Sequence, residues 1–242
     1  MTTKFFILRT PLLSLLVMTL VITGFFNAAA ADKIETYSFP TKQFTSLRIQ
    51  DNVNVFYNTS PDSIAKITYN APKDFEDAFI FTNNDGTLTI QVTTEDVGKT
   101  DLPTIHVYSN RLEKVANYSD FNVTVEHTGD VKNFEASLIG NGMINLNLIK
   151  ADHVEAKSTA GRGTIIMQGE CQDAIFRITG TGTINAENLF AKKLVCKIFG
   201  GGAIYCPNLE SLVVKGLGST RVLYPGNPVI KHRGGGKLIP LD

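Results

Sequence analysis

Hydrophobic and polar positions alternate along most of the chain, and in its second half the alternation is organised into repeats. Each repeat is centred on a glycine-rich segment, and the copies recur every 16 to 21 residues. A period of this length is typical of a solenoid with one coil per repeat. The first glycines of the six copies are Gly140, Gly161, Gly180, Gly200, Gly218 and Gly234.

An aliphatic residue stands four positions after each of these glycines, and a second, mostly apolar column follows two positions later. Apolar residues also stand two and four positions before most of the glycines. The period of two predicts strands with one buried side. The aliphatic column consists of Ile144, Ile165, Ile184, Ile204, Val222 and Leu238.

The positions three residues before the glycines are polar, and a buried column would not accept their charges unpaired. We therefore expect these side chains to face outward. The copy at Gly161 fits the pattern only with a one-residue bulge. The outward positions hold Ser137, Ser158, Arg177, Lys197, Lys215 and Lys231.

A repeat of about 20 residues is too short for a pair of helices, and Asn, Thr, Ile, Val and Gly suit strands and tight corners. The sequence therefore predicts an all-β fold, a parallel β-solenoid (β-helix) of about seven coils. The first of these coils is expected at Leu112–Val125, with Ser119 at the position of the glycine.

The pattern of residues 32–111 predicts shorter strands that cover or extend the first coil. The segment Phe79–Val92 predicts a hairpin, because Asp85 and Gly86 form a typical turn between two alternating runs. No linker rich in Pro, Gly or Ser interrupts the chain. We expect one domain over residues 32–242, with N-terminal strands and hairpin in 32–111 and repeat coils in 112–242.

Residues 1–31 have the features of a signal peptide. Lys4 and Arg9 precede an apolar run from Pro11 to Phe26, and Ala28–Ala31 offers small residues for cleavage. The run is 16 residues long, short of a membrane-spanning helix. We expect an exported protein with no membrane span after cleavage; the alternative is an uncleaved anchor.

Several motifs, in a fixed order, resemble those of the bacterial head GIN domain family of auto-transporter adhesins. They are the Gly-x-Gly-x-Ile units with GMIN at Gly142 and GTIN at Gly182, the segment Asn84–Ile90, the segment Leu102–Val107, and the segment Val222–Val229. The resemblance spans nearly all of the mature chain. It implies a right-handed β-helix-like fold at the envelope of a Gram-negative bacterium, in the periplasm or at the cell surface.

The family name alone implies adhesion, and the resemblance supplies no catalytic or ligand-binding residues. The sequence departs from the repeat at two corners, where Ser119-Asp-Phe and Gly218-Ser-Thr replace Gly-x-Gly. We expect those corners to differ in shape.

Charge is distributed unevenly. Residues 32–130 contain 8 Lys and Arg against 15 Asp and Glu, and residues 131–242 contain 13 against 8, which gives −7 and +5. This is not the concentrated basic footprint of a nucleic-acid-binding protein. The outward cations of the repeat predict a positive stripe, which serves either as a solvated face that blocks unwanted strand pairing or as a binding surface.

The motifs of common active sites are missing from the sequence. The glycine clusters precede strands, so they do not form phosphate-binding loops, and the repeats lack the aspartates of calcium-binding coils. His106, His127, His153 and His232 show no metal-binding spacing. We therefore expect no enzyme activity, cofactor or metal. The outward carboxylates, none of which is expected to stack on another, are Glu135, Glu155, Glu170, Asp173, Glu187 and Glu210.

The three cysteines fall at different kinds of position. Cys196 and Cys206 lie on inward positions of one coil, where they read as small, free core residues; the alternative is a disulfide across the coil. Cys171 follows Gly169 and Glu170 in an expected loop, and we expect it to be exposed.

These patterns predict an exported, non-enzymatic β-solenoid that binds a glycan or another envelope protein through its outward side chains. Two alternatives remain: a structural module that forms homo-oligomers through an end coil, and a glycan-active enzyme. The residues expected at the binding surface are Arg177, Lys197, Lys215, Lys231, Asn145, Asn185 and Tyr205.

Overall fold

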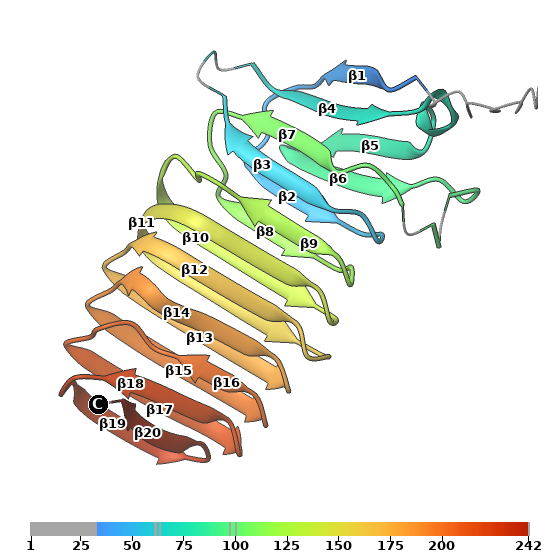
Figure 1. Ribbon diagram of the computed structural model, residues 1–242. Coiled ribbons are helices and arrows are strands. Elements are labelled where there is room, and N and C mark those ends of the chain that lie inside the picture. Colours follow the sequence, from blue (N-terminus) through green and yellow to red (C-terminus); the bar gives the residue numbers. More distant parts are fainter. Residues whose placement is uncertain (1–32, 61, 63, 97, 100, 242) are drawn as a thin grey trace, which may run out of the picture. The chain divides into compact units, whose positions relative to one another are not determined.

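The computed structural model describes residues 33–241 except 61, 63, 97 and 100. The predicted signal peptide, residues 1–31, lies outside the described residues. Within them the chain forms twenty strands and one short 3-10 turn, η1 (Lys73–Phe75). No helix in this part of the chain is long and apolar enough to cross a membrane. The predicted all-β solenoid is confirmed (Figure 1).

Each coil contributes one strand to each of two parallel sheets, which we call sheet 1 and sheet 2. In spatial order, sheet 1 consists of β6 (Thr87–Val92), β2 (Ser46–Ile49), β8 (Lys114–Asn117), β10 (Asp130–Ile139), the second part of β11 (Met143–Thr159), β13 (Asp173–Gly180), β15 (Lys193–Gly200), β17 (Ser211–Gly218) and β19 (Val229–Gly234).

Sheet 2 follows the same order of coils. It consists of β7 (Ile105–Ser109), β3 (Val55–Thr59), β9 (Asn122–Val125), the first part of β11, β12 (Thr164–Glu170), β14 (Thr183–Phe190), β16 (Ala203–Tyr205), β18 (Arg221–Pro225) and β20 (Lys237–Leu241). From β8 to β20, seven two-strand coils follow one another along the chain: β8–β9, β10–β11, β11–β12, β13–β14, β15–β16, β17–β18 and β19–β20.

The core lies between the two sheets, because alternate residues of every coil point inward. The predicted aliphatic column is fully buried from Ile144 to Val222, and only Leu238 in the last coil is partly exposed. Burial of each such side chain stabilises the fold by about 1.5–3 kcal/mol. Residues of sheet 1, including Phe176 and Cys196, pack against this column from the other side.

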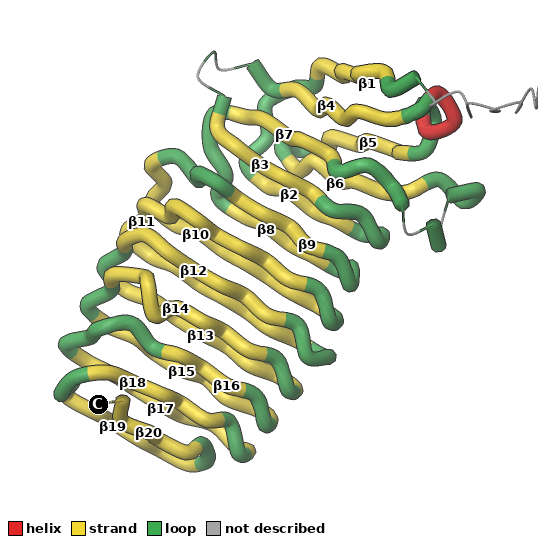
Figure 2. Tube along the Cα trace, viewed as in Figure 1, coloured by secondary structure: helices red, strands yellow, loops and turns green. Residues whose placement is uncertain are grey.

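The corners between the sheets are too tight for side chains at several glycines. A Cβ on Gly200 would lie 2.0 Å from the carbonyl oxygen of Gly180 in the coil before it. The corner at Ser119 differs, as expected: the buried side chain of Asn117 donates to the Phe121 carbonyl (2.9 Å) and accepts from the Ser119 hydroxyl (2.8 Å). Figure 2 shows these corners as short loops between strands.

The extra residue predicted for the Gly161 copy lies in the corner between Thr159 and Thr164. These two residues pair with Ile139 and Met143, which are one residue closer together in sequence, and Ala160 in this corner has a φ of 54°. The extra residue shifts the alternation, so Lys157 faces outward and Ser158 is buried. The expectation that Ser158 faces outward was therefore wrong.

All three cysteines are free and buried. Burial raises the pKa of the Cys196 thiol well above its usual range, and the neighbouring Cys206 thiol raises it further. The expected exposure of Cys171 is wrong, because its backbone N–H is bonded to the Phe190 carbonyl (2.8 Å) and its side chain is turned inward. Burial raises the pKa of the Cys171 thiol to about 12.

Near the N-terminus the order of coils in space differs from their order in sequence. The coil β2–β3 lies between β6–β7 on one side and β8–β9 on the other. Residues within 32–111 thus add two coils to the stack, besides the predicted hairpin of β5 (Phe79–Asn84) and β6. The turn residues Asp85 and Gly86 both have positive φ, as this hairpin turn requires.

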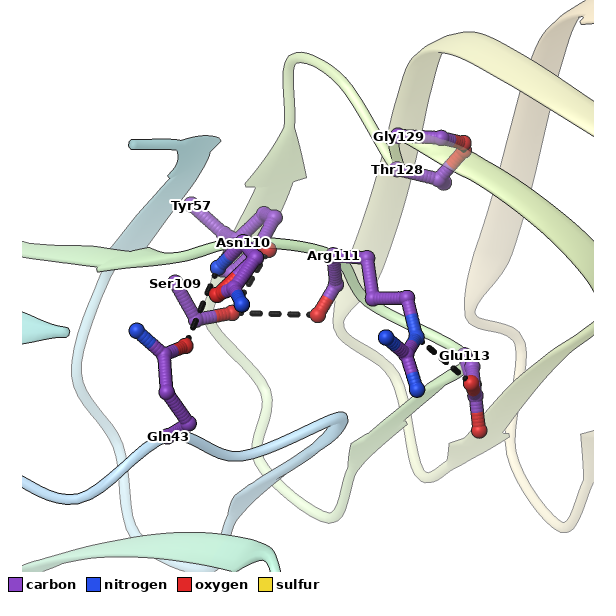
Figure 3. Close-up of polar contacts among 8 residues, drawn as sticks. All are labelled: Gln43, Tyr57, Ser109, Asn110, Arg111, Glu113, Thr128 and Gly129. Atoms are coloured by element: carbon purple, nitrogen blue, oxygen red, sulfur yellow. Dashed lines mark hydrogen bonds and ion pairs between the residues drawn. The ribbon is translucent and has the colours of Figure 1, made fainter. Parts of the chain in front are cut away.

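The chain must therefore pass the β2–β3 coil on its way from β7 to β8, and hydrogen bonds hold this crossing segment in place (Figure 3). The hydroxyls of Ser109 and Tyr57 lie 2.8 Å apart, and the Ser109 hydroxyl also donates to the carbonyl of Arg111 (3.0 Å). The N–H of Asn110 donates to the side-chain oxygen of Gln43 (3.2 Å).

Antiparallel strands cover the stack at its N-terminal end. β5 pairs with β6 at the edge of sheet 1, and β4 (Lys66–Ala71) and β1 (Glu35–Pro40) extend sheet 2 beyond β7. Aromatic side chains fill the space between them: the rings of Tyr37 and Tyr69 stack at 5.0 Å, Tyr69 meets Phe79 at 5.0 Å, and Phe39 meets Phe81 at 5.5 Å.

Candidate functional site

Five neighbouring strands of sheet 1 each present one cation in the same outward column. The register places Lys157, Arg177, Lys197, Lys215 and Arg233 side by side on β11, β13, β15, β17 and β19. Adjacent strands lie about 4.8 Å apart, so the charges follow one another closely. The predicted positive stripe thus exists, with three of its four predicted members in place.

Lys231 does not belong to this column, because it lies opposite Val213 in the next outward column. Arg233 takes its place. The sequence contains the run Gly234-Gly-Gly, and the structure pairs Gly234 with Gly216 rather than with Gly218. Counting back from the first glycine of the run therefore gave the wrong residue. Lys157 was missed because of the extra residue in the corner at Ala160; alternation followed along the strand itself would have found it.

The other predicted residues lie on the opposite side of the solenoid. Asn145, Asn185 and Tyr205 share one outward column of sheet 2, with Ile166 between the two asparagines. The Asn185 side chain donates to Glu187 (3.0 Å). Since the core separates the two sheets, the seven predicted residues form two surfaces and not one site.

Toward the N-terminal end, the cations of sheet 1 are neutralised by carboxylates. Glu135 receives Lys114 (3.1 Å) and Lys157 (3.1 Å), and Glu155 receives Lys157 (3.2 Å) and Arg177. Glu135 lies opposite Glu155 in the register, so the expectation that no two carboxylates stack was wrong. We call these five residues the ion-pair ladder.

The ladder shifts the pKa values of its members. Burial opposes the charge on Glu135 and on Glu155, but hydrogen bonds from Lys114, Lys157 and Arg177 outweigh it, so the pKa of each carboxyl is lowered. Burial likewise opposes the charge on Lys157, and the two carboxylates outweigh it and raise the pKa of Lys157. Every cation of the ladder is therefore paired with at least one carboxylate.

Beyond Arg177 this pairing of cations with carboxylates ends. Among the described residues, Lys197, Lys215 and Arg233 form no ion pair with a carboxylate. Burial lowers the pKa of Lys197, and the neighbouring charges of Arg177 and Lys215 lower it further, which shows that like charges are crowded here. Such crowding favours the binding of an anion.

We call the outer side of β15, β17 and β19 the basic face. Its outward side chains include no carboxylate, and Lys193 lies 4.0 Å from Asp173 of the neighbouring strand β13. The cations of the basic face are Lys193, Lys197, Lys215, Lys231 and Arg233.

Apolar side chains accompany these cations. Val195 and Val213 form a half-buried column beside them. At one margin of the basic face Phe199 and Leu217 lie side by side, 56% and 69% exposed, and at the other margin Val229 is 67% exposed. The basic face therefore combines unpaired positive charge with exposed apolar surface.

A separate groove of about 750 Å³ follows the corners that lead from sheet 2 into sheet 1. Side chains of both charges line it, among them Lys150, Asp152 and Glu170, and Phe190 stands exposed at its side. Within the described residues no group of His, Cys, Asp and Glu is arranged to hold a metal ion.

Fold and surface together define a class of protein, the β-solenoids that present a charged sheet surface. The chain belongs to the family "Putative auto-transporter adhesin, head GIN domain", whose model matches residues 43–228. No curated protein matches it.

Solved structures share the fold at low sequence identity. A "putative adhesin" from Bacteroides fragilis superposes with a TM-score of 0.74 at 20% identity, covering 87% of this chain and 98% of the other. A "putative adhesin" from Parabacteroides merdae gives 0.69 at 18%, covering 88% and 98%. A "putative lipid binding protein" from Parabacteroides distasonis gives 0.67 at 17%, also covering 88% and 98%.

Proposed function

We propose that this protein is an exported, non-enzymatic adhesion module that binds the anionic groups of an envelope glycan through its basic face. The adhesin family implies an exported or surface protein. The observation that carries the proposal is the contrast within sheet 1: Lys157 and Arg177 are paired with carboxylates, whereas Lys197, Lys215 and Arg233 are not.

Unpaired cations in register suit a ligand that carries negative groups in a row. Each strand offers one cation of the column and the next strand repeats it, so a chain of carboxylates or sulfates can contact several at once. Electrostatic attraction of this kind is weakened by salt. A protein that recognises only uncharged sugars would have no use for the arrangement.

The test is charge reversal with a matched control. Lys197→Glu with Lys215→Glu alters the basic face, and Arg221→Glu with Lys237→Glu makes the same change of charge on sheet 2, where both residues are exposed. We expect the first pair to weaken binding to a sulfated or uronate polysaccharide about tenfold or more, and the second to leave it nearly unchanged.

Equal effects of the two double variants, or no salt-dependent binding by the unaltered protein, would contradict the proposal. Release of new reducing ends from a bound polysaccharide would contradict its non-enzymatic part.

A structural module is the second candidate, and one observation favours it. In the described part of the chain no strand pairs with the outer edge of β19 or β20, whereas β4, β1 and β5 cover the other end. An open edge can accept a strand of another molecule. Light scattering at increasing protein concentration decides this: growth in molecular mass without a ligand supports assembly, and a constant monomer mass opposes it.

A further inference from the structure

We propose that the basic face docks on a lipid surface that carries anionic headgroups, and that Phe199 and Leu217 insert into its apolar layer. This inference goes beyond the proposed function, because it gives the cations that would bind the anionic groups of a glycan a second partner of the same chemistry, the headgroups of a lipid surface. A soluble polysaccharide alone would meet the cations but would leave the exposed apolar residues without a partner.

The arrangement of the basic face carries the inference. Phe199 and Leu217 occupy paired positions on β15 and β17, in the outward column next to Lys197 and Lys215. At 56% and 69% exposed they are among the most exposed large apolar side chains in the described part of the chain. Exposed apolar side chains that lie together mark sites of association with proteins or membranes.

Charge selects between those two partners. Lys197, Lys215, Lys231 and Arg233 lie between the two apolar margins, Lys193 stands in the column of Val229, and the outer side of β15, β17 and β19 carries no carboxylate. Each basic residue near an anionic bilayer adds attraction, and surfaces that combine cations with exposed aromatic or aliphatic residues lie in the membrane interface. A flat sheet with cations in register also matches a plane of headgroups better than a single pocket would.

The rest of sheet 1 limits the contact to this end of the solenoid. The same outward column holds Thr159 and Thr179 on β11 and β13, where Phe199 and Leu217 stand on β15 and β17. The ion-pair ladder neutralises the cations beside these threonines. Along these two columns, the exposed large apolar side chains and the unpaired cations are therefore confined to β15, β17 and β19.

The absence of tryptophan from the sequence allows a direct test, since a single introduced indole reports its own surroundings. Phe199→Trp places the reporter in the basic face. Phe190→Trp is the matched control, because Phe190 is 73% exposed but lies beside the corner groove. Each variant is mixed with vesicles of equal parts phosphatidylglycerol and phosphatidylcholine, and with vesicles of phosphatidylcholine alone.

We expect the emission of Phe199→Trp to shift to shorter wavelength with the anionic vesicles only, and that of Phe190→Trp to stay unchanged. Lys197→Glu with Lys215→Glu should lower the affinity for anionic vesicles, measured by cosedimentation, about a hundredfold. Phe199→Ser with Leu217→Ser should lower the affinity for anionic vesicles about tenfold, without changing the affinity for a soluble sulfated polysaccharide.

Each remaining outcome overturns a defined part of the proposal. Binding to the soluble polysaccharide without association with vesicles removes the lipid surface and leaves the proposed function standing. Association with vesicles without a shift for Phe199→Trp removes the apolar insertion. If the protein binds neither vesicles nor polysaccharide, both the inference and the proposed function are wrong.

Discussion

Individual residues at the corners decide whether one coil can stack on the next. Gly200, Gly202 and Gly216 each lie so close to the preceding coil that a Cβ would come within about 2 Å of a backbone carbonyl oxygen. Backbone atoms of a neighbouring coil cannot move aside without disturbing the sheet hydrogen bonds on both sides. The glycines of the repeat are therefore required by close approach, and a positive φ adds to this at Gly216.

A pair of substitutions in one corner tests this requirement. In Gly200→Ala the new methyl would lie 2.0 Å from the carbonyl oxygen of Gly180, whereas in Gly201→Ala it would meet only the Ser219 hydroxyl at 3.4 Å. We expect the first to lower the free energy of unfolding by about 2–3 kcal/mol and the second to change it by less than about 0.5 kcal/mol. Urea unfolding followed by circular dichroism measures both, and similar values for the two variants would contradict the close-approach argument.

At the scale of strands, the sequence predicted the inward columns well because the alternation of apolar and polar residues is local. Ile165 and Ile184, for example, are buried as expected and lie opposite each other. The exact register between neighbouring strands was harder to predict from the sequence. One extra residue at Ala160 and a choice among three glycines after Arg233 were enough to misplace Lys157 and Lys231 with respect to the cation column.

The order of the N-terminal coils could not be read from the sequence for a different reason. β2 and β6 carry the same alternation, with Leu47 and Ile49 in one and Leu88 and Ile90 in the other, all buried. Either strand would present a suitable apolar column to β8. The choice depends on how the crossing segment and the antiparallel cover pack, which are contacts between residues distant in sequence.

The ion-pair ladder gives a prediction at the same scale. Lys157→Met removes the cation that joins Glu135 to Glu155, and we expect it to lower the free energy of unfolding at neutral pH by about 0.5–1 kcal/mol. The lowered pKa values mean that the carboxylates stabilise the fold above their ordinary pKa of 4.5 and that this contribution is lost as the pH falls.

The cost of Lys157→Met should therefore be smaller at about pH 3 than at neutral pH, and smaller in high salt. Lys192→Met serves as the control, since Lys192 is exposed at a nearby corner and outside the ladder. Urea unfolding at both pH values measures the effect. A cost that is the same at pH 3 and pH 7 would show that packing, and not charge, accounts for it.

At the scale of the whole described unit, the two ends of the stack are built differently. The N-terminal end is covered by β1, β4 and β5 and filled by stacked aromatic rings. At the other end, Ile230 and Leu238 of the last coil remain partly exposed. In a solenoid each coil contacts only its neighbours, so stability depends on the number of coils and on how the ends are closed.

This difference predicts that the solenoid tolerates a deletion at its C-terminal end better than one at its N-terminal end. Removal of residues 226–241 takes away β19 and β20 and leaves β17–β18 as the last coil, with Leu212 and Val222 exposed much as their partners Ile230 and Leu238 are now. Removal of residues 33–41 takes away β1, and with it the ring of Tyr37 that stacks on Tyr69, which is almost fully buried. We expect the first variant to remain folded with a moderately lower melting temperature. We expect the second to lose more stability and to bind a dye for exposed apolar surface, because no inner coil can take over the role of the aromatic cover.

Thermal unfolding of both variants compares them directly, and a greater loss of stability from the C-terminal deletion would mean that the last coil, not the antiparallel strands, closes the solenoid.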